Sequence, residues 1–276
     1  MCKRAVTLVK GAAVPVDVGA LIEDLDAETA TLLEMVEPLD AAGWTTPTPA
    51  PGWRVQEQVA HLAYFDEAAT MAATDADAFQ RELEAALADT EGITERISRR
   101  AREMEPTAVL DWFTSARSAM RAAFLALDPS TRVPWYGPAM SIPSSLTARI
   151  METWAHGQDI ADGLGVPHPS TRALRQVAHI GVRTLANSFA ARGLEVPEAP
   201  VYVALVAPDG TEWTWGDAAA TDRVEGDALE FALVVTQRRH VDDTKLRITG
   251  PVATQWMSIA QAFAGPPGAG RAPSAR

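Results

Sequence analysis

Apolar side chains recur at helical spacing through the first half of the chain, at offsets of three and four residues. Each run is long enough to form one helix with a single apolar face. Two connectors rich in Pro and Gly, residues 45–54 and 128–143, interrupt the pattern and exclude regular helix there. Gly165 follows the last run, as expected at a helix stop. The pattern therefore predicts a bundle of four amphipathic helices, over residues 17–42, 55–73, 106–127 and 144–164.

Between the second and third of these helices lies a segment of different character, residues 75–105. It contains two helical pieces in which acidic and basic side chains occur together at helical offsets. Charges of mixed sign on a helix are typical of a solvent-exposed surface. We therefore expect this segment to be an exposed excursion from the bundle.

The pattern changes after residue 166, where strands join the helices. One more amphipathic helix is predicted over residues 171–193, and two short apolar runs flank the turn Asp209–Gly210, which is a strong hairpin signal. Residues 220–226 are expected to pair alongside. The run 227–240 fits a strand or a helix by periodicity, and we favour a helix. A strand over 244–250 and a helix through Trp256 complete the predicted α+β part.

These elements divide the chain of 276 residues into two domains. The predicted fold class is mainly α with an α+β C-terminal part. The bundle is expected over residues 17–166 and the α+β domain over 167–264, with a disordered leader at 1–16 and a disordered tail at 265–276.

Composition narrows the classes of partner. The net charge of −12 comes without any basic stripe, which argues against binding to nucleic acid. No uninterrupted apolar run reaches membrane-spanning length, so we expect no membrane insertion. The single cysteine, Cys2, cannot form an intramolecular disulfide, which favours a cytoplasmic protein. The sequence leaves the oligomeric state open.

The candidate chemistry lies on the last helix of the predicted bundle. Glu152 and His156 are four residues apart, so they point from one helical face at one spot. His61, on the second helix, is the best candidate for a third ligand. Such a set suits zinc, nickel or ferrous iron and leaves positions open for water or substrate. The alternative is that the pair arises by chance and His61 is a core histidine bonded to a backbone carbonyl.

Neighbouring residues could complete this site. Glu57 and Asp66, on the helix of His61, are carboxylates that could orient its imidazole, although both also fit as solvated helix charges. Trp135 and Tyr136, in the second Pro-rich connector, are expected either to wall a pocket or to anchor the connector to the bundle.

Two motifs carry a resemblance to a known family: PTPAPGWRVQEQVAHLAYFD (47–66) and ARIMETWAHGQDIADGLG (148–165). They resemble the DinB-like metal-binding superfamily, and within it the mycothiol-dependent maleylpyruvate isomerase-like family. The resemblance implies a four-helix bundle followed by a smaller, sterol-carrier-like α+β domain. It also implies a divalent metal, typically zinc, held by His61, Glu152 and His156. The family's arginine from the second domain would be Arg238 or Arg239.

The function implied by this resemblance is that of a metal-dependent enzyme that activates the thiol of mycothiol. A free thiol has a pKa of roughly 8.5, and coordination to a dication removes its proton. The thiolate would attack a small electrophilic metabolite, in an S-transferase or an isomerase. Two alternatives stay open: a metal-dependent hydrolase of a small amide or ester, with Glu57, Asp66 or Asp159 as acid or base, and a non-catalytic metal-containing binding protein.

Overall fold

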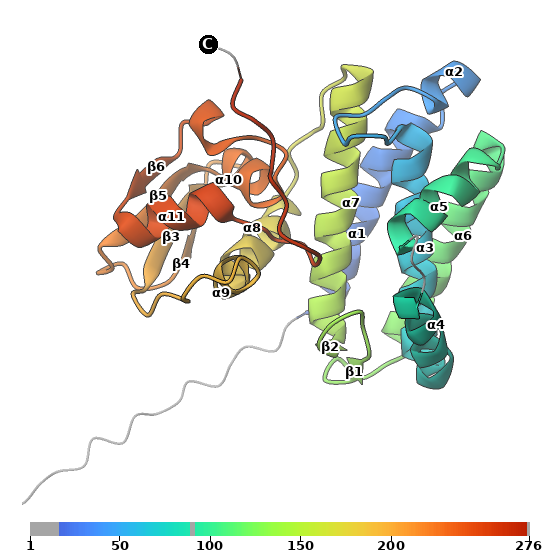
Figure 1. The fold of residues 1–276 in the computed structure, drawn as a ribbon, viewed down its shortest axis with the longest axis horizontal. Coiled ribbons are helices and arrows are strands. Elements are labelled where there is room, and N and C mark those ends of the chain that lie inside the picture. Colours follow the sequence, from blue (N-terminus) through green and yellow to red (C-terminus); the bar gives the residue numbers. More distant parts are fainter. Residues whose placement is uncertain (1–16, 89–91, 275–276) are drawn as a thin grey trace, which may run out of the picture.

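Four long helices form the first half of the structure, a computed structural model that describes residues 17–88 and 92–274. They pack side by side as a bundle (Figure 1). The predicted leader, residues 1–16, lies outside the described residues. The bundle helices are α1 (Val18–Val36), α3 (Val55–Thr74), α6 (Pro106–Leu125) and α7 (Ile142–Leu164). The predicted bundle is therefore confirmed.

Local capping interactions determine where the two helices that carry the candidate ligands begin and end. At the start of α3 the Glu57 carboxylate accepts the backbone N–H of Arg54 at 3.0 Å, which satisfies one of the free donors of the first turn. Helix α7 begins after Ser141 and ends at Gly165, whose φ of 68° is the left-handed conformation that glycine adopts without strain.

The first helix is shorter than its apolar pattern predicts. Helix α1 ends at Val36, and a separate short helix, α2 (Ala41–Trp44), follows. Pro38 lies between them, and proline has no backbone N–H to donate to the helical carbonyl four residues before it. The predicted single helix over residues 17–42 is therefore two helices.

The charged segment 75–105 is not an exposed excursion, and this expectation is wrong. It forms α4 (Ala76–Ala88) and α5 (Ile93–Arg102), and Phe79, Ile97 and Ala101 are buried. The Gln56 amide of α3 donates to the carbonyls of Ala101 and Met104. The few apolar side chains of these helices face the bundle, while their charges face outward.

The second connector holds a short antiparallel pair, β1 (Arg132–Val133) with β2 (Met140–Ser141). The loop between these strands carries Trp135 and Tyr136 back against the bundle. Trp135 stacks on Phe79 with ring centroids 6.0 Å apart. The Pro-rich composition excluded helix, as predicted, but not this pairing.

The C-terminal part combines a small sheet with short helices. Its helices are α8 (Leu174–Arg183), α9 (Leu185–Ala190), α10 (Ala228–Val235) and α11 (Pro251–Ile259), with a 3-10 turn, η1 (Val241–Asp243). Its strands are β3 (Val201–Val206), β4 (Glu212–Trp215), β5 (Asp222–Asp227) and β6 (Arg247–Thr249). The predicted helix over 171–193 is divided at Thr184, whose hydroxyl bonds the carbonyls of Ile180 and Gly181.

The sheet has the order β4-β3-β5-β6 among the described residues. The predicted hairpin is β3 with β4, closed at Gly210 with φ of 82°. Strand β5 pairs parallel to β3, with Val203 opposite Val224, and β6 pairs antiparallel to β5. The ambiguous run after Asp227 is helix α10, as favoured. The fold class, mainly α with an α+β C-terminal part, is confirmed.

Helix α7 belongs to both halves of the molecule. Ile150 and Ile160 pack into the bundle, whereas Met151 and Trp154 pack with the core of the C-terminal part. Figure 1 places α7 between the two halves. A helix that is apolar on two sides is buried on two sides, so α7 is fixed in position along most of its length.

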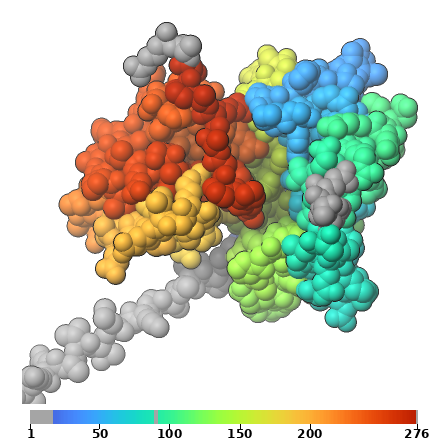
Figure 2. All heavy atoms as spheres, in the orientation of Figure 1, coloured from blue at the N-terminus to red at the C-terminus, as the bar shows by residue number. Residues whose placement is uncertain are grey.

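The tail is the last difference from the prediction. Residues 265–274 lie in the seam between the two halves (Figure 2, dark red). Arg271 pairs with Asp159 at 2.6 Å and with Asp162 at 2.9 Å, and Arg192 donates to the carbonyl of Gly268 at 2.8 Å. Composition predicts disorder here, but these ion pairs hold the segment against α7.

Candidate metal centre

Helices α3 and α7 bring the three candidate ligands together. One donor atom from each of His61, Glu152 and His156 lies within 4.8 Å of the other two. His156 Nε2 is 3.2 Å from Glu152 Oε2, and His61 Nε2 is 3.8 Å from the same oxygen. The spacing on α7 predicted the first contact, and the packing of α3 against α7 supplies the second.

These separations fit a bound cation. Ligands at the usual zinc distances in a tetrahedral site lie about 3.3 Å from one another. The observed 3.2 and 3.8 Å bracket this value. Two imidazoles and one carboxylate are also the donor set of open zinc sites, which keep further positions for water or substrate. The three residues therefore fit a divalent metal.

A residue that the sequence did not single out orients His156. Gln58 Oε1 lies within hydrogen-bond distance of His156 Nδ1, and the Gln58 amide donates to Thr48 Oγ1 at 2.8 Å. Thr48 in turn donates to the Trp53 carbonyl at 3.0 Å. With Nδ1–H donating to Gln58, the lone pair of Nε2 faces Glu152, as a metal ligand requires.

Neither Glu57 nor Asp66 orients the His61 imidazole, and neither is a solvated helix charge, because both carboxylates are buried in ion pairs. Gln58 orients the other histidine, His156. Glu57 pairs with Arg54 at 2.8 Å and Arg102 at 2.9 Å. Asp66 pairs with Arg117 and Arg149. The sequence did hold a signal, because Gln58 precedes His61 by three positions and shares its helical face.

Aromatic rings enclose the imidazoles. Trp53 stacks on His156, with ring centroids 5.8 Å apart and planes inclined by 15°. Phe65 lies 4.6 Å from the His61 ring. Apolar neighbours exclude water and favour uncharged imidazoles.

The electrostatics hold His61 and Glu152 in their ligand forms. Burial, together with repulsion between the two imidazoles when both are protonated, lowers the pKa of His61 to about 4. Burial alone would raise the pKa of Glu152, but the imidazoles of His156 and His61 outweigh it and hold this pKa well below its usual range. At neutral pH the centre therefore presents a neutral His61 beside an ionised Glu152.

A cavity of about 710 Å³ opens beside the centre. His61 and Glu152 form part of its wall, and the loop between β1 and β2 contributes Trp135 and Tyr136. Helices α8 and α9 and residues 261–265 close it from the C-terminal part. Both expectations for the two aromatic residues therefore hold, because they wall a cavity and also pack on Phe65 and Phe79.

A second buried polar cluster adjoins the centre. Asp66 on α3 accepts from Arg117 of α6 at 2.6 Å and from Arg149 of α7 at 2.9 Å. Arg117 also donates to the hydroxyls of Thr29 on α1 and Thr153 on α7. This network therefore joins all four bundle helices at one carboxylate.

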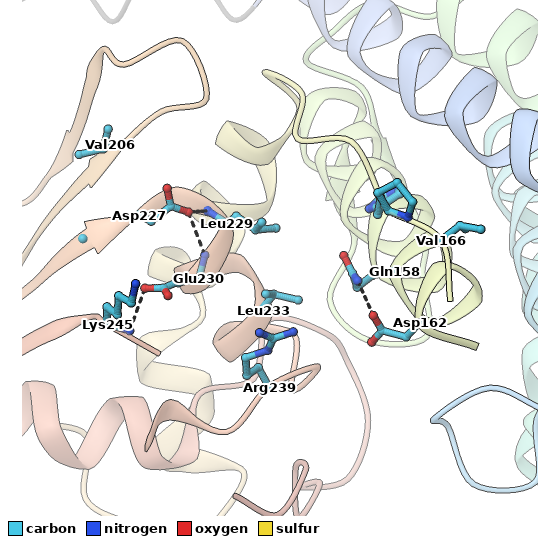
Figure 3. A pocket seen from close by; sticks show the side chains of 13 residues that line it. Gln158, Asp162, Val166, Val206, Asp227, Leu229, Glu230, Leu233, Arg239 and Lys245 are labelled. Carbon is cyan, nitrogen blue, oxygen red and sulfur yellow. Dashed lines mark hydrogen bonds between the residues drawn. The ribbon is translucent and has the colours of Figure 1, made fainter. Parts of the chain in front are cut away.

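The structure does not bring the two predicted arginines to the cavity. Arg238 Nη2 donates to Asp159 at 2.8 Å, one turn beyond His156 on α7. Arg239 lies in a separate, open cleft of about 870 Å³, between Gln158 and Asp162 on α7 and Glu230 and Lys245 of the C-terminal part (Figure 3). Arg238 thus connects the two halves, and Arg239 lines a cleft to which none of the three ligands contributes.

No helix in residues 17–88 and 92–274 is both long and apolar enough to cross a membrane.

Comparisons with known proteins place these features in a family. The model of a family described as the mycothiol maleylpyruvate isomerase N-terminal domain matches residues 25–161. Uncharacterized proteins from two strains of Mycobacterium tuberculosis are 41% identical over 255 residues, which is 92% of this chain and 99% of each of theirs.

Two solved structures share the fold. The crystal structure of the mycothiol-dependent maleylpyruvate isomerase matches with a TM-score of 0.56 and 15% identity, over 81% of this chain and 90% of that one. A His-to-Ala mutant of that enzyme matches with a TM-score of 0.57 and 16% identity, over 84% of this chain and 93% of that one. At this level of identity the likeness concerns the fold.

Proposed function

The chain belongs to the mycothiol-dependent maleylpyruvate isomerase-like family of DinB-like proteins, and from this premise we propose that it is a metal-dependent enzyme that uses mycothiol. Its thiol cosubstrate would attack a small electrophilic metabolite in the cavity beside His61 and Glu152, in an isomerase or an S-transferase. The convergence of His61, Glu152 and His156 on one spot at the cavity wall carries this proposal.

Different residues would bind the cation, orient a ligand and exclude water. His61, Glu152 and His156 would hold the cation, zinc being the metal that the family resemblance implies, with nickel or ferrous iron as alternatives that the donor set also suits. When bound, the cation lowers the pKa of a thiol from roughly 8.5, so that the thiolate forms at neutral pH. Gln58 keeps the His156 lone pair turned toward Glu152, and Trp53 and Phe65 exclude water.

The nucleophilic sulfur has to come from outside the protein. Cys2 is the only cysteine in the sequence, and it lies outside the described residues. An added thiolate would form one carbon–sulfur bond with the electrophile. In a transferase that bond persists, whereas in an isomerase it breaks again after rotation about the single bond left by addition to a conjugated double bond.

The hydrolase alternative lacks a free acid or base. Each of the three carboxylates considered for that role pairs with two arginines: Glu57 with Arg54 and Arg102, Asp66 with Arg117 and Arg149, and Asp159 with Arg238 and Arg271. A carboxylate in two ion pairs is a poor proton acceptor, because both charges favour its ionised form. A purely structural metal is also disfavoured, since structural zinc sites are closed by four protein ligands.

The resemblance also implies an arginine from the C-terminal part, and Arg238 is the better supported of the two candidates. It is held by Asp159 next to the centre, whereas Arg239 lines the open cleft. We propose that Arg238 positions the C-terminal part against α7. A cytoplasmic location remains a prediction from the sequence.

The test is a thiol-dependent assay on purified protein of known metal content. We expect turnover of maleylpyruvate, or conjugation of 1-chloro-2,4-dinitrobenzene, only with both metal and mycothiol. His156→Ala should lower the rate at least about a hundredfold, since a lost ligand removes the cation, while His240→Ala, at the half-buried histidine that caps η1, should not. Arg238→Gln should lower the rate more than Arg239→Gln. Turnover without thiol, or full activity of His156→Ala, would contradict the proposal.

A further inference from the structure

A buried arginine forms part of the cavity wall next to the candidate metal centre. Arg149 lies on α7 three residues before Glu152, and both side chains line the cavity. The Arg149 side chain is only 4% exposed. Its Nε donates to Asp66 at 2.9 Å and its Nη2 reaches the Leu62 carbonyl at 3.4 Å. Its Nη1 has no hydrogen-bond partner among the described residues.

The charges around this arginine do not balance. Asp66 carries one negative charge and pairs with two guanidinium groups, those of Arg149 and Arg117. The Arg117 side chain uses its remaining groups on the Thr29 and Thr153 hydroxyls, inside the bundle. Glu152 forms no ion pair with Arg149 within the described chain, and it contacts His61 and His156 instead. The surplus positive charge therefore lies at the cavity wall.

Burying an unbalanced charge is unfavourable unless a partner compensates it. Asp66 compensates one guanidinium, so the cavity is the place from which a second anion can reach Arg149. The other arginine on this wall, Arg132, is exposed and donates to the Ala139 carbonyl. Arg149 is thus the buried cation that faces the cavity, in the part of the chain that the structure describes.

The rest of the wall is mostly apolar. Trp135, Tyr136 and Phe65 form one side, and Ile180 and Phe263 contribute from the C-terminal part. Apolar pockets with a few placed polar groups orient a ligand through those groups. Such a wall suits a ligand with a planar or apolar body and one anionic end.

We propose that Arg149 determines substrate specificity by binding a carboxylate of the electrophilic substrate. Guanidinium groups bind carboxylates through paired N–H donors, and a buried one does so without competition from water. Arg149 and Glu152 are three residues apart, which corresponds to about 4.5 Å along the helix axis. A substrate whose carboxylate binds Arg149 would therefore have carbons a few bonds away beside Glu152. The inference rests on the proposed function, because it takes this cavity as the substrate site.

Binding of benzoate and of its uncharged analogue benzamide tests this assignment without thiol or turnover. We expect calorimetry on the purified protein to give about tenfold or more tighter binding of benzoate, as for a hydrogen bond to a charged group. Arg149→Gln should abolish this preference. Arg132→Gln is the matched control, since it removes the exposed arginine of the same wall and leaves the charges around Asp66 unchanged, and it should keep the preference. So should His156→Ala, which removes a metal ligand.

Three results would overturn the proposal: no preference in the wild-type protein, a preference that survives Arg149→Gln, or an equal loss in Arg132→Gln or His156→Ala. If Arg149→Gln does not fold, crystals of the wild-type protein soaked with 4-bromobenzoate decide the question. The carboxylate should lie within hydrogen-bond distance of Arg149, and any other position would overturn the assignment. Failure of the thiol-dependent assay leaves this measurement unaffected, so the two proposals fail separately.

Discussion

Helices α3 and α7 carry two buried polar clusters that adjoin each other and are satisfied in different ways. In the Asp66 cluster the carboxylate accepts from two guanidinium groups, and two threonine hydroxyls take further N–H groups of Arg117. In the His61–Glu152–His156 cluster, three groups with lone pairs face one another. The first consists of donors matched to acceptors except at Arg149 Nη1, and the second consists of acceptors that face one another.

This difference separates a structural role from a chemical one. Donors that meet acceptors inside the bundle join helices, and in this cluster only Arg149 keeps a donor for a ligand. Lone pairs that converge on one point need a cation or protons, and the low pKa of His61 disfavours protons there. The same two helices therefore provide stability at Asp66 and a candidate binding site at Glu152. Arg149 lies at the boundary, because it belongs to the first cluster and faces the cavity of the second.

The largest expected effect comes from breaking the matched cluster. Asp66→Asn removes the shared carboxylate and leaves two guanidinium groups buried, which should lower the free energy of unfolding by about 3–5 kcal/mol. Denaturant unfolding of the metal-free protein measures it. The control is Asp26→Asn, which breaks the exposed pair with Arg121, with both side chains 45% exposed, and should cost less than about 1 kcal/mol. Equal effects would show that the Asp66 network does not hold the bundle together.

The second prediction concerns the support of the metal centre. Gln58→Ala removes the acceptor from His156 Nδ1 and frees the ring to turn, so metal affinity should fall about tenfold to a hundredfold. A competition titration against a chelator measures the affinity. Gln80→Ala, at an exposed glutamine on α4, is the control and should bind metal like the wild-type protein. Unchanged affinity in Gln58→Ala would mean that the packing of α3 and α7 alone orients the imidazole.

The third prediction concerns a buried carboxyl that belongs to neither cluster. Glu28 on α1 accepts from the Thr171 hydroxyl, and its Oε2 lies 3.8 Å from His168 Nε2. Burial raises the pKa of Glu28 from 4.5 to about 7. The folded state therefore keeps this proton up to about pH 7, whereas the unfolded state releases it near pH 4.5. Its contribution to stability is complete below pH 4.5 and is lost as the pH rises through 7.

Glu28→Gln keeps the uncharged shape and removes the titration. Relative to the wild-type protein, this variant should therefore gain stability between pH 4.5 and 7, by at most about 1.4 kcal/mol for each unit of pH. Unfolding curves across this range measure the difference in slope. Glu34→Gln, at an exposed glutamate on the same helix, should follow the wild-type slope. Parallel curves for Glu28→Gln would mean that Glu28 is ionised in the folded protein at neutral pH.

Much of the bundle and the core of the site can be predicted from the sequence. The spacing of Glu152 and His156 is a local property, because a helix converts a separation of four residues into a shared face. The stop at Gly165 and the turn at Gly210 are equally local, since glycine alone adopts their backbone conformation without strain. His61 could be named as a partner because apolar neighbours made a solvated histidine unfavourable.

Other expectations failed where the outcome depends on distant residues. Glu57 and Asp66 have the right type and spacing to orient His61, yet arginines from α5, α6 and α7 occupy them. The charged segment 75–105 packs against α3 through a few buried apolar side chains. Its charged residues are so numerous that the sequence alone indicates an exposed surface. The ion pair between Arg271 and Asp159 holds the tail in place. These residues are 112 positions apart in the sequence, so no local pattern predicts the pair.

By itself the sequence determined the helices, their apolar faces and the Glu152–His156 pair one turn apart, because these follow from backbone geometry and from residue type within a few positions. Only the tertiary structure decided that Gln58 orients His156, that Asp66 holds two arginines and that Arg149 faces the cavity. Each of these depends on which donor and which acceptor meet when helices pack, and burial makes that choice selective, since an unmatched polar group inside a protein is costly.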